Sequence, residues 1–292
     1  MTQPQEIPGK VTFLDGNGDL PKLEISTPWS DAEIYLQGAH VTRFQKKGEP
    51  PLLFLSQISR FQSGQAIRGG IPIIFPWFGS REGQPQHGFA RNSAWELKEI
   101  LPSASGEVSF KFILPECPQA GLLPSFAAEY VVFVGKTLSA QFSVTNASAD
   151  QDLTFEDCLH SYFTVGDIGA VSIIGLEGAE YLDKTENFSR KKQTDEPTRI
   201  TSETYRIYLG THSAVEIQDK SLKRRILVQK SGSASTVVWN PWAARAQQMP
   251  DFGNDEYLKM VCVESGNVAD NKQSLKPGQR SSLKIELSSA PL

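Results

Sequence analysis

Hydrophobic and polar residues alternate with a period of two along much of the chain. In residues 138–145 every second side chain is apolar, so the apolar ones would face one way and the polar ones the other, as in a half-buried strand. Residues 130–134 repeat the pattern, and Gly135-Lys136 between the two runs predicts a hairpin. The other segments in which alternation predicts a strand are 108–114, 34–41, 226–230 and 283–287.

The chain shows little sign of helices. Apolar residues spaced three and four apart are nowhere sustained, and residues 52–61 are the segment in which we expect a short helix. Many short strands, punctuated by 23 glycines and 18 prolines, are typical of a large antiparallel sandwich or barrel. The polar segment 185–202 is interpreted as a surface loop rather than a domain linker, because strand signals resume directly after it. The sequence predicts an all-β protein with few short helices, in which residues 1–292 form a single domain.

The composition is that of a folded protein, with 39% hydrophobic and 21% charged residues. A formal net charge of −4 argues against a nucleic-acid partner, because such a surface normally needs a broad basic face. No apolar stretch is long enough to span a bilayer, and the N-terminus carries no secretory signal, so we expect a cytoplasmic protein without a membrane partner. Its three widely spaced cysteines match neither a disulfide framework nor a metal site. The oligomeric state stays open.

Arginines are concentrated in residues 60–91. This window contains four arginines and a single acid, Glu82, so it is locally positive within an acidic chain. A guanidinium group can donate two parallel hydrogen bonds to a phosphate or a carboxylate. The structural alternative is a solvated loop whose arginine stems lie along the surface. The window predicts a site for a small acidic ligand.

Two further segments place ionisable side chains on faces of predicted strands. His160 lies on a polar face of residues 154–162 that could line a cleft, although a lone histidine in a strand is more often a structural residue. Glu264 would end an apolar strand, directly before Ser265-Gly266. Partial burial there would raise the pKa of Glu264 and suit it to act as a general base. The alternative is a solvent-facing glutamate at a strand end.

Together these segments resemble the hexose-6-phosphate mutarotases, which are glucose-6-phosphate 1-epimerases of the aldose 1-epimerase superfamily. The resemblance implies a large galactose-mutarotase-like β-sandwich that needs no cofactor and no metal. It also implies interconversion of the α and β anomers of a hexose 6-phosphate such as glucose 6-phosphate. The motifs follow the family's order over nearly the whole chain: RGGIPIIFPWFG, QHGFARNSAWEL, LHSYFTVGDI, GLEGAEYLDK, SETYRIY, VVWNPW and EYLKMVCVESGNV.

The resemblance implies roles for individual residues. His160 matches the histidine that protonates the ring oxygen, and Glu264 matches the glutamate that removes the proton from the anomeric hydroxyl. In this scheme His160 starts charged and Glu264 starts ionised. Tyr205 stands where the family usually has an aspartate, and this departure bears on substrate preference. The matched substrate-binding positions are Arg68, Gln86, His87 and Arg91; Arg68 and Arg91 are the expected phosphate clamp, and His87 either contacts the sugar or holds the turn.

Two other classes of function remain open. A noncatalytic sugar-phosphate sensor on the same fold would keep the arginines and aromatic residues, but it would not need both His160 and Glu264. A glycoside-processing enzyme would need two catalytic carboxylates. Asp157 could be paired with Glu264, but its strand parity is opposite to that of His160, so it should point away from the cleft. The joint presence of an acid and a base favours the mutarotase.

Overall fold

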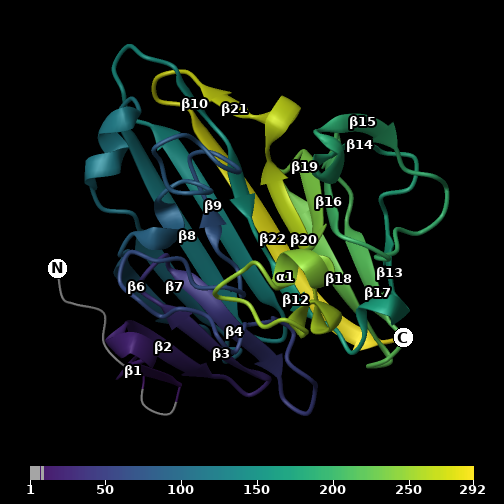
Figure 1. Ribbon diagram of the computed structural model, residues 1–292. Coiled ribbons are helices and arrows are strands. Elements are labelled where there is room, and N and C mark those ends of the chain that lie inside the picture. The colour runs from purple at the N-terminus through teal and green to yellow at the C-terminus, as the bar shows by residue number, and fades with distance from the viewer. Residues whose placement is uncertain (1–6, 8–9) are drawn as a thin grey trace.

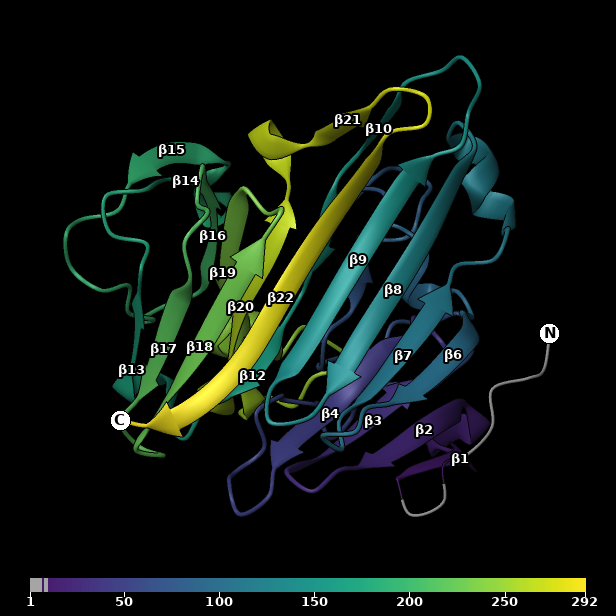
Figure 2. The same cartoon turned by 180° about the vertical axis from the view of Figure 1, so that it is seen from behind.

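Two large antiparallel sheets form most of the protein (Figures 1 and 2), whose computed structural model describes residue 7 and residues 10–292. The first, the back sheet, has the order β13 (Val171–Ile174), β17 (Val215–Asp219), β18 (Arg224–Ser231), β22 (Arg280–Pro291), β9 (Leu138–Asn146), β8 (Phe126–Val134), β7 (Val108–Ile113) and β6 (Glu96–Pro102). The second, the site sheet, has the order β15 (Ser189–Lys192), β14 (Glu180–Asp183), β16 (Thr204–Leu209), β19 (Ser235–Asn240), β20 (Met260–Asn267), β11 (Asp157–Leu159) and β5 (Ile73–Ile74), with β12 (Tyr162–Thr164) also paired to β20.

Smaller elements complete the fold. A four-stranded sheet contains β1 (Val11–Asp15), β2 (Pro21–Ser26), β3 (Ser30–Tyr35) and β4 (His40–Lys46), and β10 (Leu153–Phe155) pairs with β21 (Gln273–Leu275). The helical elements of the described residues are short: α1 (Trp242–Ala246) and the 3-10 turns Asn17–Asp19, Ala90–Asn92, Pro118–Leu122, Ile168–Ala170, Lys184–Glu186, Glu256–Lys259 and Ala269–Asn271. None of these helices is both long and apolar enough to cross a bilayer.

A shared hydrophobic core joins the three main sheets. Most strands of the back sheet turn alternate side chains inward, as Tyr130 and Val132 do in β8. Phe75, directly after β5, lies at the centre of an aromatic group and meets the rings of Phe89, Phe126, Phe142 and Phe155 edge to face, with centroids 5.2–6.1 Å apart. Edge-to-face contacts add stabilisation to the area that the rings bury. The group anchors the segment that leads from β5 to the pocket described below.

The all-β fold class predicted from the sequence is confirmed, and most of the predicted strands are present. Residues 108–114 correspond to β7, and residues 226–230 and 283–287 lie inside β18 and β22. The predicted hairpin is formed by β8 and β9, which pair from Phe126 with Asn146 to Val134 with Leu138. The single-domain assignment stays a prediction.

Three local predictions were wrong. Residues 34–41 do not form one strand, because the chain turns between β3 and β4, where Gly38 and Ala39 take φ angles of 73° and 45°. Residues 52–61 form no helix; their backbone groups bond to distant segments, and the Phe54 N–H donates to the carbonyl of Tyr162 at 3.0 Å. The predicted surface loop 185–202 contains the edge strand β15.

Asp157 carries a buried carboxyl group on β11. Its side chain is 1% exposed and accepts a hydrogen bond of 2.9 Å from Asn267 Nδ2 on β20. Burial raises the pKa of Asp157 to about 7, because the charged form loses its hydration. Between about pH 4 and pH 7 the folded protein keeps a proton that the unfolded chain releases. The stabilising contribution of the neutral carboxyl is fully present below about pH 4 and is lost as the pH rises towards 7.

The substitution Asp157→Asn should therefore stabilise the protein at neutral and alkaline pH. We expect the free energy of unfolding to match that of the parent chain near pH 4 and to exceed it at pH 8 by a few kcal/mol, ~4 kcal/mol at most. Urea titrations of both proteins at each pH measure the difference, in which the other titrating groups cancel. An equal difference at both pH values would show that folding does not raise the pKa of Asp157.

Candidate active site

A pocket of about 490 Å³ opens on the site sheet. Its floor and walls come from segments that are far apart in the chain, including β12, β16, β19, the loop that follows β5 and the segment around α1. The residues that line it are Arg68, Ser80, Gln86, His87, His160, Tyr162, Lys184, Thr185, Glu203, Tyr205, Trp239, Arg245, Gln248 and Met249.

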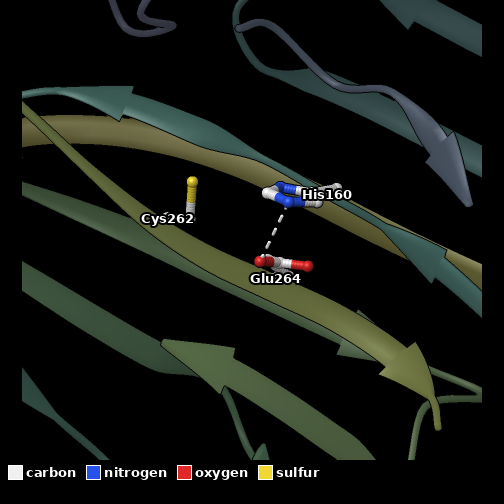
Figure 3. Close-up of side chains that lie close together, drawn as sticks. All are labelled: His160, Cys262 and Glu264. Atoms are coloured by element: carbon white, nitrogen blue, oxygen red, sulfur yellow. Dashed lines mark ion pairs between the residues drawn. The ribbon is translucent and has the colours of Figure 1, made fainter. Parts of the chain in front are cut away.

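The register of β20 brings His160 and Glu264 together. β11 pairs Leu159 with Ser265, and β12 pairs Tyr162 with Cys262, so the same antiparallel register sets His160 opposite Glu264. Directly opposed residues point to the same face of a sheet. His160 Nε2 lies 3.3 Å from Glu264 Oε1 (Figure 3). The next opposed pair on this face of the sheet is Tyr162 and Cys262.

Aromatic rings hold the His160 imidazole. The imidazole is stacked on the ring of Tyr162, with centroids 4.7 Å apart and planes 7° apart. Trp239 and His87 meet it edge-on at 6.1 and 5.6 Å. Trp239 of β19 is paired with Cys262 of β20, which is paired in turn with Tyr162 of β12, so the three residues lie side by side across the sheet. His160 is thus fixed at the pocket floor, with only 5% of its surface exposed.

Burial favours the uncharged form of both members of the pair. It raises the pKa of Glu264 well above its ordinary value, although the Cys158 thiol, which donates to Oε2 at 3.5 Å, and the positive charge of Lys184 oppose the rise. Burial also lowers the pKa of His160 well below its ordinary value, and nearby arginines add to the effect. Both shifts favour the neutral pair in the free protein. The expectation that His160 starts charged and Glu264 ionised stays a prediction.

Glu264 is more deeply buried than its sequence predicted. The strand continues through Ser265 and Gly266 to Asn267, so Glu264 lies inside β20 rather than at its end. Its exposure is 0%, and it does not line the pocket, whereas its neighbour His160 does. Among the described residues Oε1 of Glu264 has no hydrogen-bond partner, although it lies 3.3 Å from His160 Nε2. Because such an orphaned buried oxygen costs free energy, the carboxyl group is poised to accept a donor from a ligand.

The sequence around His160 forms three short strands, β10, β11 and β12, instead of the single one that was expected. The predicted assignment of these side chains to the two faces of the strands nevertheless holds at the site. Cys158, His160 and Tyr162 share the pocket side, while the carboxyl group of Asp157 bonds to Asn267 and does not line the pocket.

The expected substrate-binding residues occupy different depths. Arg68 lines the pocket and is neutralised by Asp251, to which Nε and Nη2 donate at 3.2 and 3.0 Å. Its Nη1 also donates to the Tyr162 hydroxyl at 3.2 Å. Arg91 is 6% exposed and lies behind the wall, where its Nη2 donates to the carbonyl oxygen of Gln86 at 2.8 Å. Burial, with repulsion from Arg68, lowers the pKa of Arg91 to about 10.

His87 holds the turn and also faces the pocket. Its imidazole Nδ1 accepts a hydrogen bond from the backbone N–H of Gly79 at 3.1 Å. The backbone N–H of His87 donates to the carbonyl oxygen of Gly79 at 2.7 Å. Both readings of this histidine from the sequence are thus compatible with its position. Gln86 beside it lines the pocket as well.

Several wall residues were missed by the sequence reasoning. Lys184 ends the motif GLEGAEYLDK, and Arg245 lies three residues after the end of the motif VVWNPW, so both were within reach of the motifs. No sequence pattern pointed to the ion pair between Asp251 and Arg68, because the two residues are 183 positions apart in the chain.

The floor also holds a set of possible metal ligands. One donor atom each from His160, Cys262 and Glu264 lies within 4.8 Å of the others (Figure 3). Nitrogen, sulfur and oxygen donors of this kind suit zinc. The expectation of a metal-free site therefore stays a prediction, and it is tested below.

Comparison with known proteins gives the family. The sequence model described as aldose 1-epimerase matches residues 21–288. A protein of Cenchrus ciliaris, provisionally named glucose-6-phosphate 1-epimerase, is 36% identical over 89% of this chain and 82% of its own. A protein of Escherichia coli K12 with the same provisional name is 33% identical over 88% of this chain and 87% of its own.

Solved structures agree with this assignment. The crystal structure of a protein of Salmonella typhimurium, provisionally described as a mutarotase, superposes with a TM-score of 0.90 at 32% identity, covering 99% of this chain and 96% of that one. A galactose mutarotase-like protein of Clostridium acetobutylicum shares the fold, with a TM-score of 0.71 at 15% identity over 97% of this chain and 98% of its own. The predicted galactose-mutarotase-like sandwich is thereby confirmed, and the chain belongs to the aldose 1-epimerase family.

Proposed function

We propose that this protein interconverts the α and β anomers of hexose 6-phosphates, with glucose 6-phosphate as the expected substrate. The proposal is carried by the His160 and Glu264 pair, whose Nε2 and Oε1 atoms lie 3.3 Å apart at the floor of a pocket with several cationic wall residues. A member of the aldose 1-epimerase family with such a pocket is suited to a sugar that carries an anionic group. The provisional names of its relatives agree with this substrate class.

The reaction needs one proton acceptor and one proton donor. Glu264 accepts the proton of the anomeric hydroxyl O1, His160 donates a proton to the ring oxygen, and the bond between C1 and the ring oxygen breaks. The resulting C1 carbonyl turns, and the ring oxygen attacks its other face while both protons return. A well-placed proton-transfer group typically contributes about 10²–10⁴ in rate, so the pair needs no covalent nucleophile.

Binding of the sugar prepares the pair for this step. The O1 hydroxyl supplies the hydrogen-bond donor that Glu264 Oε1 lacks in the free protein. A hydrogen bond to the carboxylate favours the charged form, so the shared proton moves to His160 without changing the total charge of the pair. Because His160 covers Glu264, the imidazole must shift aside for O1 to reach the carboxylate.

The remaining matched residues orient the ring. Arg68, Gln86 and His87 line the pocket and are proposed to contact the sugar. Arg91 is proposed to support them, since it bonds to the Gln86 carbonyl from behind. Contacts of this type bind the substrate and hold C1 at the proton-transfer pair, and this positioning raises the rate.

The decisive measurement is anomer-exchange NMR on the purified protein. It compares glucose 6-phosphate, galactose 6-phosphate, mannose 6-phosphate and free glucose at one ionic strength. Exchange of a hexose 6-phosphate faster than the spontaneous background supports the proposal. A protein that binds these sugars without accelerating exchange would instead be a sensor.

Removing either member of the pair should abolish most of the exchange. For Glu264→Gln and His160→Ala we expect kcat to fall by at least about 10², because each loses one proton-transfer group while the pocket wall remains. Sugar binding, measured by calorimetry, should change far less than kcat. Near-normal exchange in a folded variant would contradict the role proposed for that residue.

Chelation should leave the activity unchanged. We expect full exchange after prolonged EDTA treatment, because proton transfer by His160 and Glu264 needs no Lewis acid. The control is the same protein dialysed without chelator. Loss of exchange that added zinc restores would instead identify the His160, Cys262 and Glu264 group as a metal centre.

A further inference from the structure

Three different kinds of donor atom meet at the floor of the pocket. A ring nitrogen of His160, the sulfur of Cys262 and a carboxyl oxygen of Glu264 lie within 4.8 Å of one another (Figure 3). Cys262 and Glu264 are two residues apart on β20, so they share a face of the sheet, and His160 lies opposite that face between β11 and β12. The register that assembles the proton-transfer pair therefore brings a thiol to the same place. The reaction proposed above makes no use of this thiol.

The spacing of these donors is close to that of a tetrahedral zinc site. Zinc bonds of about 2.0–2.2 Å to nitrogen and oxygen, at tetrahedral angles, set those two donors about 3.3–3.5 Å apart. Nε2 of His160 and Oε1 of Glu264 are already 3.3 Å apart. The sulfur must come from at most 4.8 Å to about 3.6 Å from its neighbours, given a zinc–sulfur bond of about 2.3 Å. Small side-chain rotations supply such a shift.

Glu264 directs an unsatisfied oxygen atom into this group. Its Oε1 has no hydrogen-bond partner among the described residues, and the residue is 0% exposed. The other oxygen, Oε2, accepts a hydrogen bond of 3.5 Å from the Cys158 thiol, which orients the carboxyl group. Support of this kind for the second oxygen is typical of carboxylates that bind metals. A metal ion on Oε1 would remove the cost of the orphaned oxygen.

A zinc ion would bring no net charge to the buried floor. Cysteine and glutamate bind metals as thiolate and carboxylate, and histidine binds as the neutral imidazole, so the ion displaces the protons of its ligands. The three ligands then carry two negative charges, which balance Zn²⁺. Arg68 on the wall is already paired with Asp251 at 3.0 Å, which reduces its repulsion of the ion. Mg²⁺ and Ca²⁺ prefer oxygen donors, so the mixed set selects zinc.

The pocket gives the ion a route to these donors. His160 lines the pocket, whereas Cys262 and Glu264 are fully buried beside it. The shift of the imidazole that admits O1 of the sugar also admits an ion. Three protein ligands leave the fourth tetrahedral position to water. An ion bound to Nε2 and Oε1 occupies both atoms that the proposed reaction uses, so zinc and the anomeric centre of the sugar exclude each other.

We propose that His160, Cys262 and Glu264 form an inhibitory zinc site, in which the bound ion blocks proton transfer and Cys262 provides the selectivity for zinc. The inhibition rests on the proposed function, whereas the binding of zinc does not. The ion is a reversible inhibitor and not a cofactor, so the metal-free protein is the active form.

Calorimetry of the metal-free protein with Zn²⁺ and with Mg²⁺ tests the site directly. We expect one equivalent of zinc to bind per chain, and no magnesium at the same concentration. Co²⁺ in the site should show the charge-transfer absorption of a thiolate ligand. Cys262→Ala should raise the Kd of zinc at least about tenfold and abolish this absorption. Cys262→Ser, which keeps the size of the side chain, replaces it if thermal denaturation shows that the alanine variant is unfolded. Unchanged zinc binding in the folded variant would overturn the proposal.

The other two cysteines of the chain provide matched controls. Cys117 is free and half-buried just before the turn Pro118–Leu122, and Cys117→Ala should bind zinc like the parent protein. Cys158→Ala keeps all three proposed ligands and should still bind one equivalent. Loss of zinc binding in the Cys158 variant, with normal binding in the Cys262 variant, would overturn the assignment of the sulfur ligand.

Anomer-exchange NMR with glucose 6-phosphate measures the inhibition. At a free zinc concentration of about ten times its Kd, we expect the apparent KM to rise about elevenfold with kcat unchanged, because zinc and sugar compete. EDTA should restore the original KM. Exchange by Cys262→Ala should not respond to the same zinc, which also controls for zinc bound by the sugar phosphate. Equal inhibition of both proteins, or activation by zinc, would overturn the proposal.

The two measurements separate the failure of this proposal from the failure of the proposed function. If zinc binds through Cys262 but the metal-free protein accelerates no exchange, the function fails and the zinc site stands without an inhibitory role. If the metal-free protein exchanges hexose 6-phosphates and one equivalent of zinc neither binds nor inhibits, the zinc site fails and the function stands.

Discussion

The register of β20 against β11 and β12 is the constraint on which the candidate site depends. It sets His160 opposite Glu264 and Tyr162 opposite Cys262, on one face of the site sheet. Because side chains alternate between the faces of a strand, a slip of one residue would turn Glu264 away from the pocket. The two residues are 104 positions apart in the chain, so only the sheet can bring them together. The aromatic group around Phe75 packs beneath the segment that leads to this face and fixes it to the core.

Burial then determines the chemistry of the opposed pair. In water a histidine and a glutamate at this separation would form an ordinary ion pair, but at the pocket floor burial raises the pKa of Glu264 and lowers that of His160. The neutral arrangement and the ion pair contain the same single proton. Moving it between Nε2 and Oε1 therefore changes no net charge, which limits the cost of proton transfer in a buried site. Cys158 contributes by donating to the other carboxyl oxygen, which leaves Oε1 for a ligand.

The sequence predicted those features that depend on local pattern. Alternation identified β7, β8, β9 and parts of β18 and β22, because each has one face in the core. It failed at residues 34–41, where a turn at Gly38 and Ala39 interrupts an otherwise regular pattern. The short helix expected at residues 52–61 is absent, because the backbone of this segment bonds to other segments. Ser265-Gly266 suggested a strand end that pairing with β11 and β19 overrides. Ordered motifs led to His160 and Glu264, whereas the pairing of Arg68 with Asp251 has no local signature.

The floor and the wall of the pocket differ in charge. Burial favours the uncharged forms of His160 and Glu264 at the floor, which suits proton transfer, and the wall carries the cationic side chains of Arg68, Lys184 and Arg245. A group remote from the reacting carbon can supply binding energy that orients the ring without altering the chemistry at C1. Tyr205 contacts both the floor and the wall. Its partner on the adjacent strand, Trp239, packs against His160, and the Lys184 ammonium lies over the ring of Tyr205.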